Sequence, residues 1–103
     1  MALNLAPSHE ILQILGQRLR IQRLAQGLPQ RELALMAGLS LGALRKLEST
    51  GQSSLETLIR AVQALGLVDE LESLFVLKRQ SIAQMESAEA ANLRQRAPRR
   101  RST

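Results

Sequence analysis

The fold of this chain follows from residues 28–48, which read LPQRELALMAGLSLGALRKLE. We interpret this segment as two short helices that cross at a steep angle around a tight turn. Ala34 is small enough to lie where the helices approach each other, and Gly38 tolerates the positive φ that the turn requires. Leu39 is expected to fill the core beneath the turn, and Ser40 to cap the second helix. The second helix should then stand clear enough of its neighbours to fit a groove about 12 Å wide, the width of the DNA major groove.

Apolar spacing predicts three further helices around this pair, so the expected fold is all-α. The first helix begins at Ser8, its predicted N-cap, and ends at Gly27. The fourth follows a predicted capping box over residues 53–56, and the fifth covers residues 69–77. We expect a compact five-helix domain over residues 8–78. The residues predicted to face its core are Ile11, Leu12, Leu15, Leu19, Leu24, Leu33, Ala34, Met36, Ala37, Leu44, Leu47, Leu55, Leu58, Ile59, Val62, Leu65, Leu71, Leu74 and Phe75.

Charge is distributed unevenly along the 103 residues, whose formal net charge is +5. Five of the 14 basic residues and no acidic residue lie in residues 92–103, so residues 1–91 are neutral as a whole. Residues 79–93 are expected to form a weakly helical extension, and residues 94–103 a disordered basic tail. Within the neutral part, basic residues dominate 11–46 and acidic residues dominate 48–72. This layout indicates that one face of the domain meets a polyanion.

Several function classes are unexpected for this sequence. It has no cysteine, which excludes a disulfide framework, a cysteine-based zinc site and a thiol nucleophile. The first ten residues do not resemble a signal peptide, and no apolar run approaches the roughly 20 residues of a membrane span, so we expect a cytoplasmic protein without membrane contact. His9, the one histidine, has no titratable partner at a recognisable spacing. We therefore expect no enzyme activity, cofactor or metal.

Several short motifs lie within and on both sides of the central segment, each at a characteristic distance from the others. They are Leu19 with Arg23, Gly27-Leu28, Gln30, Leu33-Ala34, Gly38-Leu39-Ser40, Leu44, Leu47-Glu48, residues 54–58 and Ala64-Leu65-Gly66. Together they resemble the Cro/cI-type repressors, the XRE-type helix-turn-helix regulators, over roughly residues 15–75. The resemblance implies a lambda-repressor-like domain that binds double-stranded DNA. Because one recognition helix covers too few base pairs to specify a site, we expect a homodimer on an inverted repeat.

The resemblance also implies roles for individual residues. Gln30 matches a glutamine that grips a phosphate, and Arg23 and Glu48 match a partly buried ion pair, which we interpret as structural. Residues 40–43 and 45–46 match the positions that face base edges and backbone. The expected DNA-contacting residues are Gln30, Arg31, Ser40, Leu41, Gly42, Ala43, Arg45 and Lys46. The tail is expected to add phosphate contacts through Arg94, Arg96, Arg99, Arg100 and Arg101.

Two departures from the family pattern leave alternatives open. Pro29 replaces a capping residue, and the recognition helix begins with Leu41, Gly42 and Ala43, which have no side chain that hydrogen-bonds a base edge. One hypothesis is a sequence-specific transcriptional repressor. Its narrower form is an autoregulating antitoxin, because residues 65–75 and the arginine-rich tail resemble the HipB-like branch, whose members bind a HipA-like kinase toxin. The alternative is a protein-interaction module on a helix-turn-helix core with little or no specific DNA binding.

Overall fold

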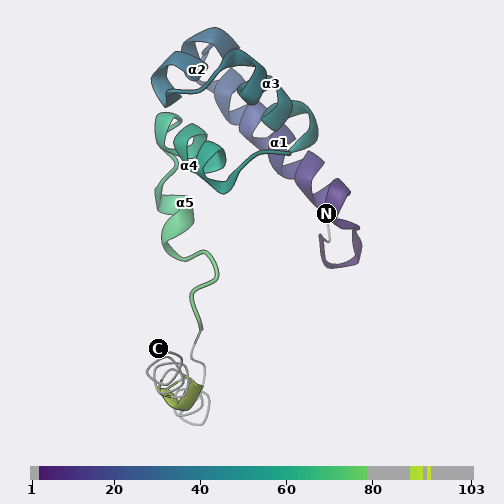
Figure 1. The fold of residues 1–103 in the computed structure, drawn as a ribbon, viewed down its shortest axis with the longest axis vertical. Helices are drawn as coiled ribbons and strands as arrows, with labels where there is room; N and C mark the ends of the chain where they lie inside the picture. Colours follow the sequence, from purple (N-terminus) through teal and green to yellow (C-terminus); the bar gives the residue numbers. More distant parts are fainter. Residues whose placement is uncertain (1–2, 79–88, 92, 94–103) are drawn as a thin grey trace, which may run out of the picture. The chain divides into compact units, whose positions relative to one another are not determined.

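Within residues 3–78, one short 3-10 helix and five α-helices follow one another (Figure 1). The computed structural model describes residues 3–78, 89–91 and 93. The 3-10 helix η1 spans Leu3–Leu5, followed by α1 (Ser8–Ala25), α2 (Gln30–Ala37), α3 (Leu41–Thr50), α4 (Leu55–Ala64) and α5 (Asp69–Glu72). The described residues include no strand. The predicted all-helical class with a helix-turn-helix core is confirmed.

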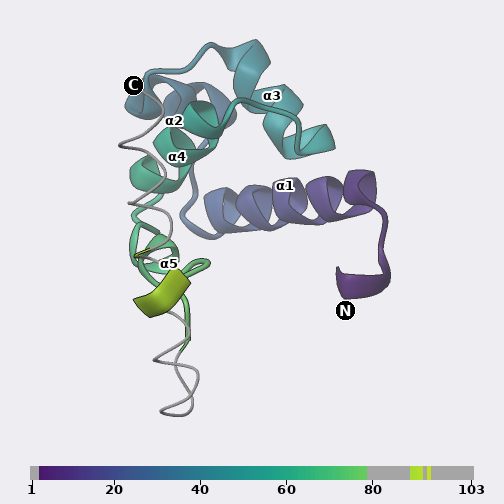
Figure 2. The ribbon, with the colours of Figure 1, turned by 60° about the horizontal axis from the view of Figure 1, so that its bottom comes forward.

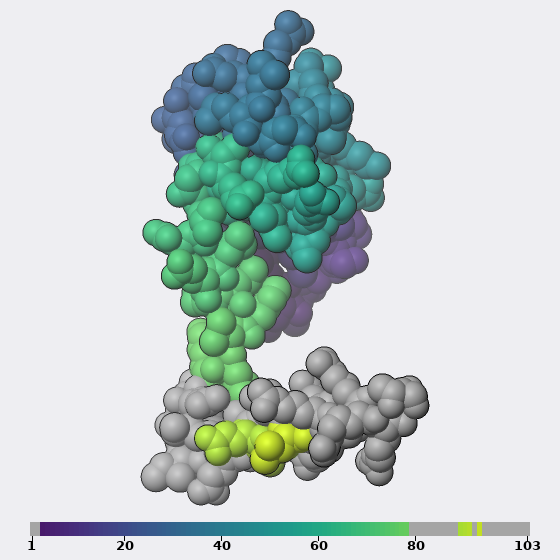
Figure 3. All heavy atoms as spheres, turned by 60° about the vertical axis from the view of Figure 1, so that its left-hand side comes forward, coloured from purple at the N-terminus to yellow at the C-terminus, as the bar shows by residue number. Residues whose placement is uncertain are grey.

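The core lies where α2, α3 and α4 meet. Leu33, Ala34, Leu44 and Leu65 form one buried cluster, and a partly buried shell packs against it. Complete burial of one leucine side chain stabilises a fold by about 1.5–3 kcal/mol. Helix α2 packs on both α3 and α4, while α1 packs along α3 (Figures 1 and 2). In the space-filling view, α2 lies directly against the atoms of α3 and α4 (Figure 3).

The crossing of α1 and α3 is unusually close and depends on two glycines. A Cβ on Gly16 would collide with the backbone carbonyl of Leu47 and lie 3.0 Å from the carbonyl oxygen of Glu48. Gly51, which ends α3 at φ 76°, is blocked in the same way by the backbone of Leu12. The two helices therefore touch backbone to backbone. Sequence reasoning missed this contact because no apolar periodicity marks it.

Gly16→Ala is expected to lower the free energy of unfolding by about 1–3 kcal/mol, because the added methyl forces α1 and α3 apart. Gly42→Ala is the matched control, since a Cβ at this helical position meets nothing within 4 Å. Alanine has the higher helix propensity, so this change should stabilise the protein by up to about 1 kcal/mol. Urea denaturation followed by circular dichroism measures both. Equal effects of the two substitutions would contradict the close crossing.

Two predicted helix caps are wrong. Ser8 is the first residue of α1, and Pro7 occupies the N-cap without a side-chain hydrogen bond. The cap of α4 lies one residue later than predicted: Ser54 Oγ accepts the backbone N–H of Thr57 at 3.0 Å. With Ser54 as the N-cap, the third residue of α4 is Thr57, where a capping box has glutamate. Glu56 instead forms an ion pair with Arg60. Adjacent serines offer the same capping chemistry, so the sequence alone did not resolve the register.

The predicted inner faces of α1, α2 and α4 are partly wrong. In α1, Leu12, Leu15 and Leu24 are exposed, because this helix turns Gly16 and Arg23 toward α3. The other exceptions are Met36, which is 55% exposed, and Leu55, which is 71% exposed. The core positions Leu33, Ala34, Ala37, Leu44, Leu47, Val62 and Leu65 are buried as predicted.

The predicted nine-residue fifth helix is also wrong. Helix α5 stops at Glu72, and Phe75 has a φ of 60°, which an α-helix does not allow. Phe75 is 94% exposed and Leu74 is 50% exposed, so these two side chains gain little from burial within the described residues that would support a helix. Contacts divide the chain into two units, Met1–Leu71 and Glu72–Thr103. The predicted extension and tail lie outside the described residues, apart from residues 89–91 and 93. No helix of the described part is long and apolar enough to cross a membrane.

Candidate nucleic-acid interface

The turn between α2 and α3 has the geometry that the sequence predicts. Gly38 adopts φ 67° and ψ 34°, and the N–H of Leu39 returns to the carbonyl of Ala34 at 2.8 Å. Ser40 caps α3, because its Oγ accepts the N–H of Ala43 at 3.0 Å. Leu39 is only partly buried and is not among the residues that pack against the core cluster, so the expectation that it fills the core is wrong. Backbone and cap together fix the direction in which α3 leaves the turn.

Helix α4 holds the turn from the other side, a contact that sequence reasoning missed. Arg60 Nη1 donates to the carbonyl oxygen of Gly38 at 3.2 Å, and Nη2 donates to Glu56 at 2.8 Å. The Glu56 side chain is largely exposed and the Arg60 side chain about half exposed, so this pair contributes little by itself. The spacing of four residues between Glu56 and Arg60 was the available signal. The contact between Arg60 and Gly38 joins residues that are 22 positions apart, and no sequence pattern indicated it.

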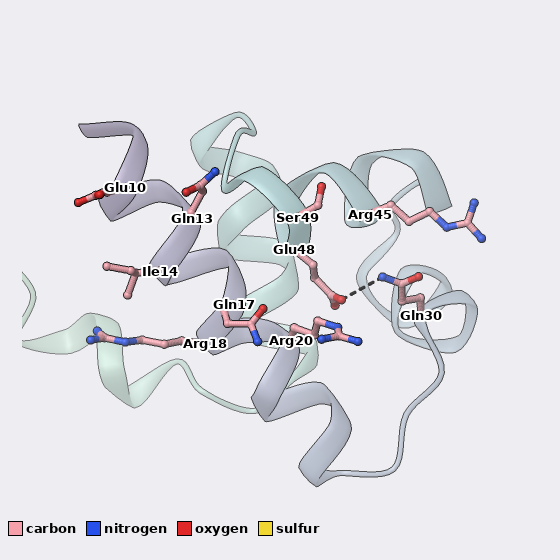
Figure 4. Close-up of a pocket in the computed structure, with 10 residues that line it drawn as sticks. All are labelled: Glu10, Gln13, Ile14, Gln17, Arg18, Arg20, Gln30, Arg45, Glu48 and Ser49. Atoms are coloured by element: carbon pink, nitrogen blue, oxygen red, sulfur yellow. Dashed lines mark hydrogen bonds between the residues drawn. The ribbon is translucent and has the colours of Figure 1, made fainter. Parts of the chain in front are cut away.

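The outer surface of α3 presents the residues predicted to meet DNA. Arg45 and Lys46 are exposed, and they are the long polar side chains near the start of this helix. Ser40 and Gly42 are exposed, whereas Leu41 and Ala43 are partly buried. Arg45 extends away from α3 beside Gln30 (Figure 4). The chemistry available to α3 for base contacts therefore lies mainly in its two basic residues.

A buried ion pair links α1 to α3. Arg23 donates from Nε to Glu48 Oε2 at 2.8 Å and from Nη2 to Oε1 at 3.0 Å. Its Nη1 donates to the carbonyl oxygen of Leu28 at 2.8 Å. Arg23 is 6% exposed and Glu48 4% exposed, and no buried side-chain polar atom of the described residues lacks a partner. The pair implied by the resemblance is thus present as a bidentate, fully hydrogen-bonded contact.

Gln30 belongs to the same network. Its Nε2 donates to Glu48 Oε1 at 3.0 Å from the first residue of α2 (Figure 4). The amide group keeps a second N–H for another acceptor. The predicted role of Gln30 as a phosphate ligand stays a prediction. What the structure adds is that Glu48 orients this amide, which links it to Arg23.

A groove of about 670 Å³, lined mostly by polar and charged residues, lies between α1 and α3. One wall is a single face of α1, and the other is α3 with the first residue of α2. Its lining residues are Glu10, Gln13, Ile14, Gln17, Arg18, Arg20, Gln30, Arg45, Glu48 and Ser49. The groove includes the predicted residues Gln30 and Arg45, whereas Arg31 and Lys46 lie outside it. The α1 wall was not foreseen, because the sequence does not reveal which face of α1 borders α3. No metal-binding cluster of His, Asp and Glu occurs in the described part of the chain.

A family model described as a helix-turn-helix matches residues 19–73. The match begins within α1 and ends just after α5, so it includes the turn, the cap of α3 and the ion pair. It covers more than half of the chain. No curated protein matches the sequence.

Proposed function

We propose that this chain, which belongs to the Cro/cI-type helix-turn-helix family of DNA-binding transcription regulators, is a repressor of a specific double-stranded site. The proposal rests on one observation: α3 is held in place at both ends while its basic side chains remain exposed. The turn, the Ser40 cap and the Glu48 ion pair fix this helix, and its Arg45 and Lys46 remain exposed. A rigid helix with free basic side chains suits insertion into a major groove.

The start of α3 sets a limit on direct sequence recognition. Leu41 and Ala43 offer only apolar contact with a thymine methyl, and Gly42 offers no side chain. We propose that Arg45 and Lys46 supply the polar base contacts and that DNA shape supplies part of the discrimination. The second candidate, a protein-interaction module, is favoured by the same three residues.

Binding to the DNA upstream of the protein's own gene separates these two functions. A repressor should protect one discrete, saturable site with inverted symmetry in a footprinting titration. It should retain this preference in an excess of unrelated duplex. Equal affinity for the upstream DNA and the unrelated duplex, or no binding at physiological salt, would contradict the repressor function. The protein-interaction module would then be the remaining candidate.

We further propose that the repressor is a homodimer. Residues Leu74, Phe75, Val76 and Leu77 form a run of four exposed apolar side chains. Such a run is unusual on a monomer surface and typical of an interface. Two-fold pairing would separate the recognition helices by one DNA turn, about 34 Å.

Phe75→Glu is expected to shift the protein from dimer to monomer, because it places a charge where an apolar contact forms. Operator affinity should then fall at least about tenfold, since each subunit alone binds half a site. Sedimentation equilibrium and footprinting measure the two effects. Leu5→Glu is the control, since Leu5 is also highly exposed but precedes α1. A Phe75→Glu variant that remains dimeric would contradict this surface.

The narrower function that we propose is autoregulation as an antitoxin of a HipA-like kinase. The resemblance of residues 65–75 to the HipB-like branch supports it, together with the arginines of residues 94–103, which lie outside the described residues. Co-expression with the product of a neighbouring kinase gene should relieve its toxicity and increase repression. Repression without any such neighbour would limit the function to the regulator alone.

A further inference from the structure

We propose that the groove between α1 and α3 receives a phosphate of the DNA backbone, with Arg20 of α1 as its main donor. This inference rests on the proposed DNA binding and extends it to a helix outside the helix-turn-helix pair. It assigns Arg20 a contact that neither the sequence motifs nor the position of α3 gives it.

Donors from three helices surround one end of the groove. Arg20 comes from α1, Gln30 from the first residue of α2 and Arg45 from α3. In Figure 4, Arg20 and Gln30 lie beside Glu48, with Gln30 hydrogen-bonded to its carboxylate, and Arg45 extends past Gln30 away from Glu48. Gln30 also lies at the N-terminus of α2, where the helix dipole favours an anion. Guanidinium groups suit phosphate because their N–H donors match its oxygens in pairs.

The negative charge at the floor of the groove is already compensated. Both oxygens of Glu48 accept from Arg23, and Oε1 also accepts from Gln30. The other acid of the lining, Glu10, lies ten residues before Arg20 in α1, or about 15 Å along the helix. Within the described residues, neither Arg20 nor Arg45 takes part in an ion pair. The charge of Arg20 is therefore available to an incoming phosphate, while Arg45 at the edge of the groove remains free to reach a base edge.

The groove also lies where a DNA backbone would pass. Arg45, on the exposed face of α3, is part of its wall. When a recognition helix enters the major groove, the flanking phosphates pass along its sides and the preceding elements of the domain. The groove has a volume of about 670 Å³ over its whole length, so its size does not exclude a phosphate group.

The test compares Arg20→Ala with Arg18→Ala in the full chain. Arg18 is also exposed, lies on the same helix and lines the other end of the groove, away from Gln30 and Arg45 in Figure 4. Binding to the operator is titrated between 0.05 and 0.5 M salt (a range of roughly one decade), where each phosphate contact contributes about 0.9 to the slope of log K against log salt. Arg20→Ala should lower that slope by about 0.9 relative to Arg18→Ala. If the two variants bind equally at 1 M salt, a slope difference of about 0.9 makes Arg20→Ala bind about eightfold more weakly than Arg18→Ala at 0.1 M salt.

Two further measurements identify the contact. Arg20→Lys should restore most of the slope, because an ammonium group also binds phosphate. The preferred DNA sequence should be the same for every variant, since phosphate contacts carry no sequence information. Thermal unfolding should be unchanged, because Arg20 is exposed and makes no ion pair in the described structure.

A slope for Arg20→Ala equal to that of the wild-type protein would overturn the phosphate contact while leaving the repressor intact. An altered sequence preference in Arg20→Ala would also overturn it, because Arg20 would then read bases. Failure of the unmodified protein to form any saturable DNA complex would instead overturn the proposed function itself. The wild-type titration tests the proposed function, and the slopes and sequence preferences of the variants test the phosphate contact.

Discussion

Replacing Arg23 or Glu48 with alanine is expected to lower the free energy of unfolding by about 3–5 kcal/mol. Each substitution leaves the opposite charge buried without its partner, since the two residues are 6% and 4% exposed. Arg23→Ala also removes the donor to the carbonyl oxygen of Leu28, which lies between α1 and α2. Urea denaturation followed by circular dichroism measures the loss.

A double-mutant cycle with apolar replacements tests whether the two losses arise from one interaction. Arg23→Met combined with Glu48→Leu should cost much less than the sum of the single substitutions, because no unpaired charge remains. The exposed pair of Glu56 and Arg60 is the control within the same protein. Its disruption should cost less than about 1 kcal/mol. Additive losses at Arg23 and Glu48 would contradict the coupling.

The parts of the fold that sequence reasoning predicted correctly depend on local chemistry. Gly38 in a left-handed turn, Ser40 as a cap and the buried Leu44 and Leu47 each follow from a few neighbouring residues. Spacing along one helix is enough to place them. The contact of Arg23 with Glu48 spans 25 residues, and only the family resemblance implied it.

The parts that were not predicted depend on distant surfaces. The apolar stripe of α1 suggested a leucine-lined interface, yet the helix meets α3 through Gly16, at a distance set by the backbone of α3. The same crossing forms the groove that contains Arg20, so its α1 wall was missed too. Helix α5 was overpredicted for a related reason. Helix-forming residues do not maintain a helix where no surface buries Phe75.

Arg45→Ala combined with Lys46→Ala is expected to abolish specific operator binding, with the largest effect of any surface change in this chain. Each side chain that contacts a base edge should contribute about 1–3 kcal/mol of discrimination. The free energy of unfolding should barely change, because both residues are exposed on α3, opposite the buried Leu44 and Leu47. Footprinting on operator and unrelated duplex at one fixed salt concentration measures affinity and specificity together.

Removing two positive charges weakens binding to any DNA, so the control variant must also lose two positive charges. Arg18→Ala with Lys78→Ala removes the same charge at exposed positions outside α3. The control should weaken operator and unrelated DNA by the same factor and preserve their ratio. The Arg45 and Lys46 variant should instead bring the two affinities together, because it removes the polar base contacts that we propose for α3. If the ratio survives this double substitution, α3 does not read the operator, and sequence recognition must come from another part of the chain.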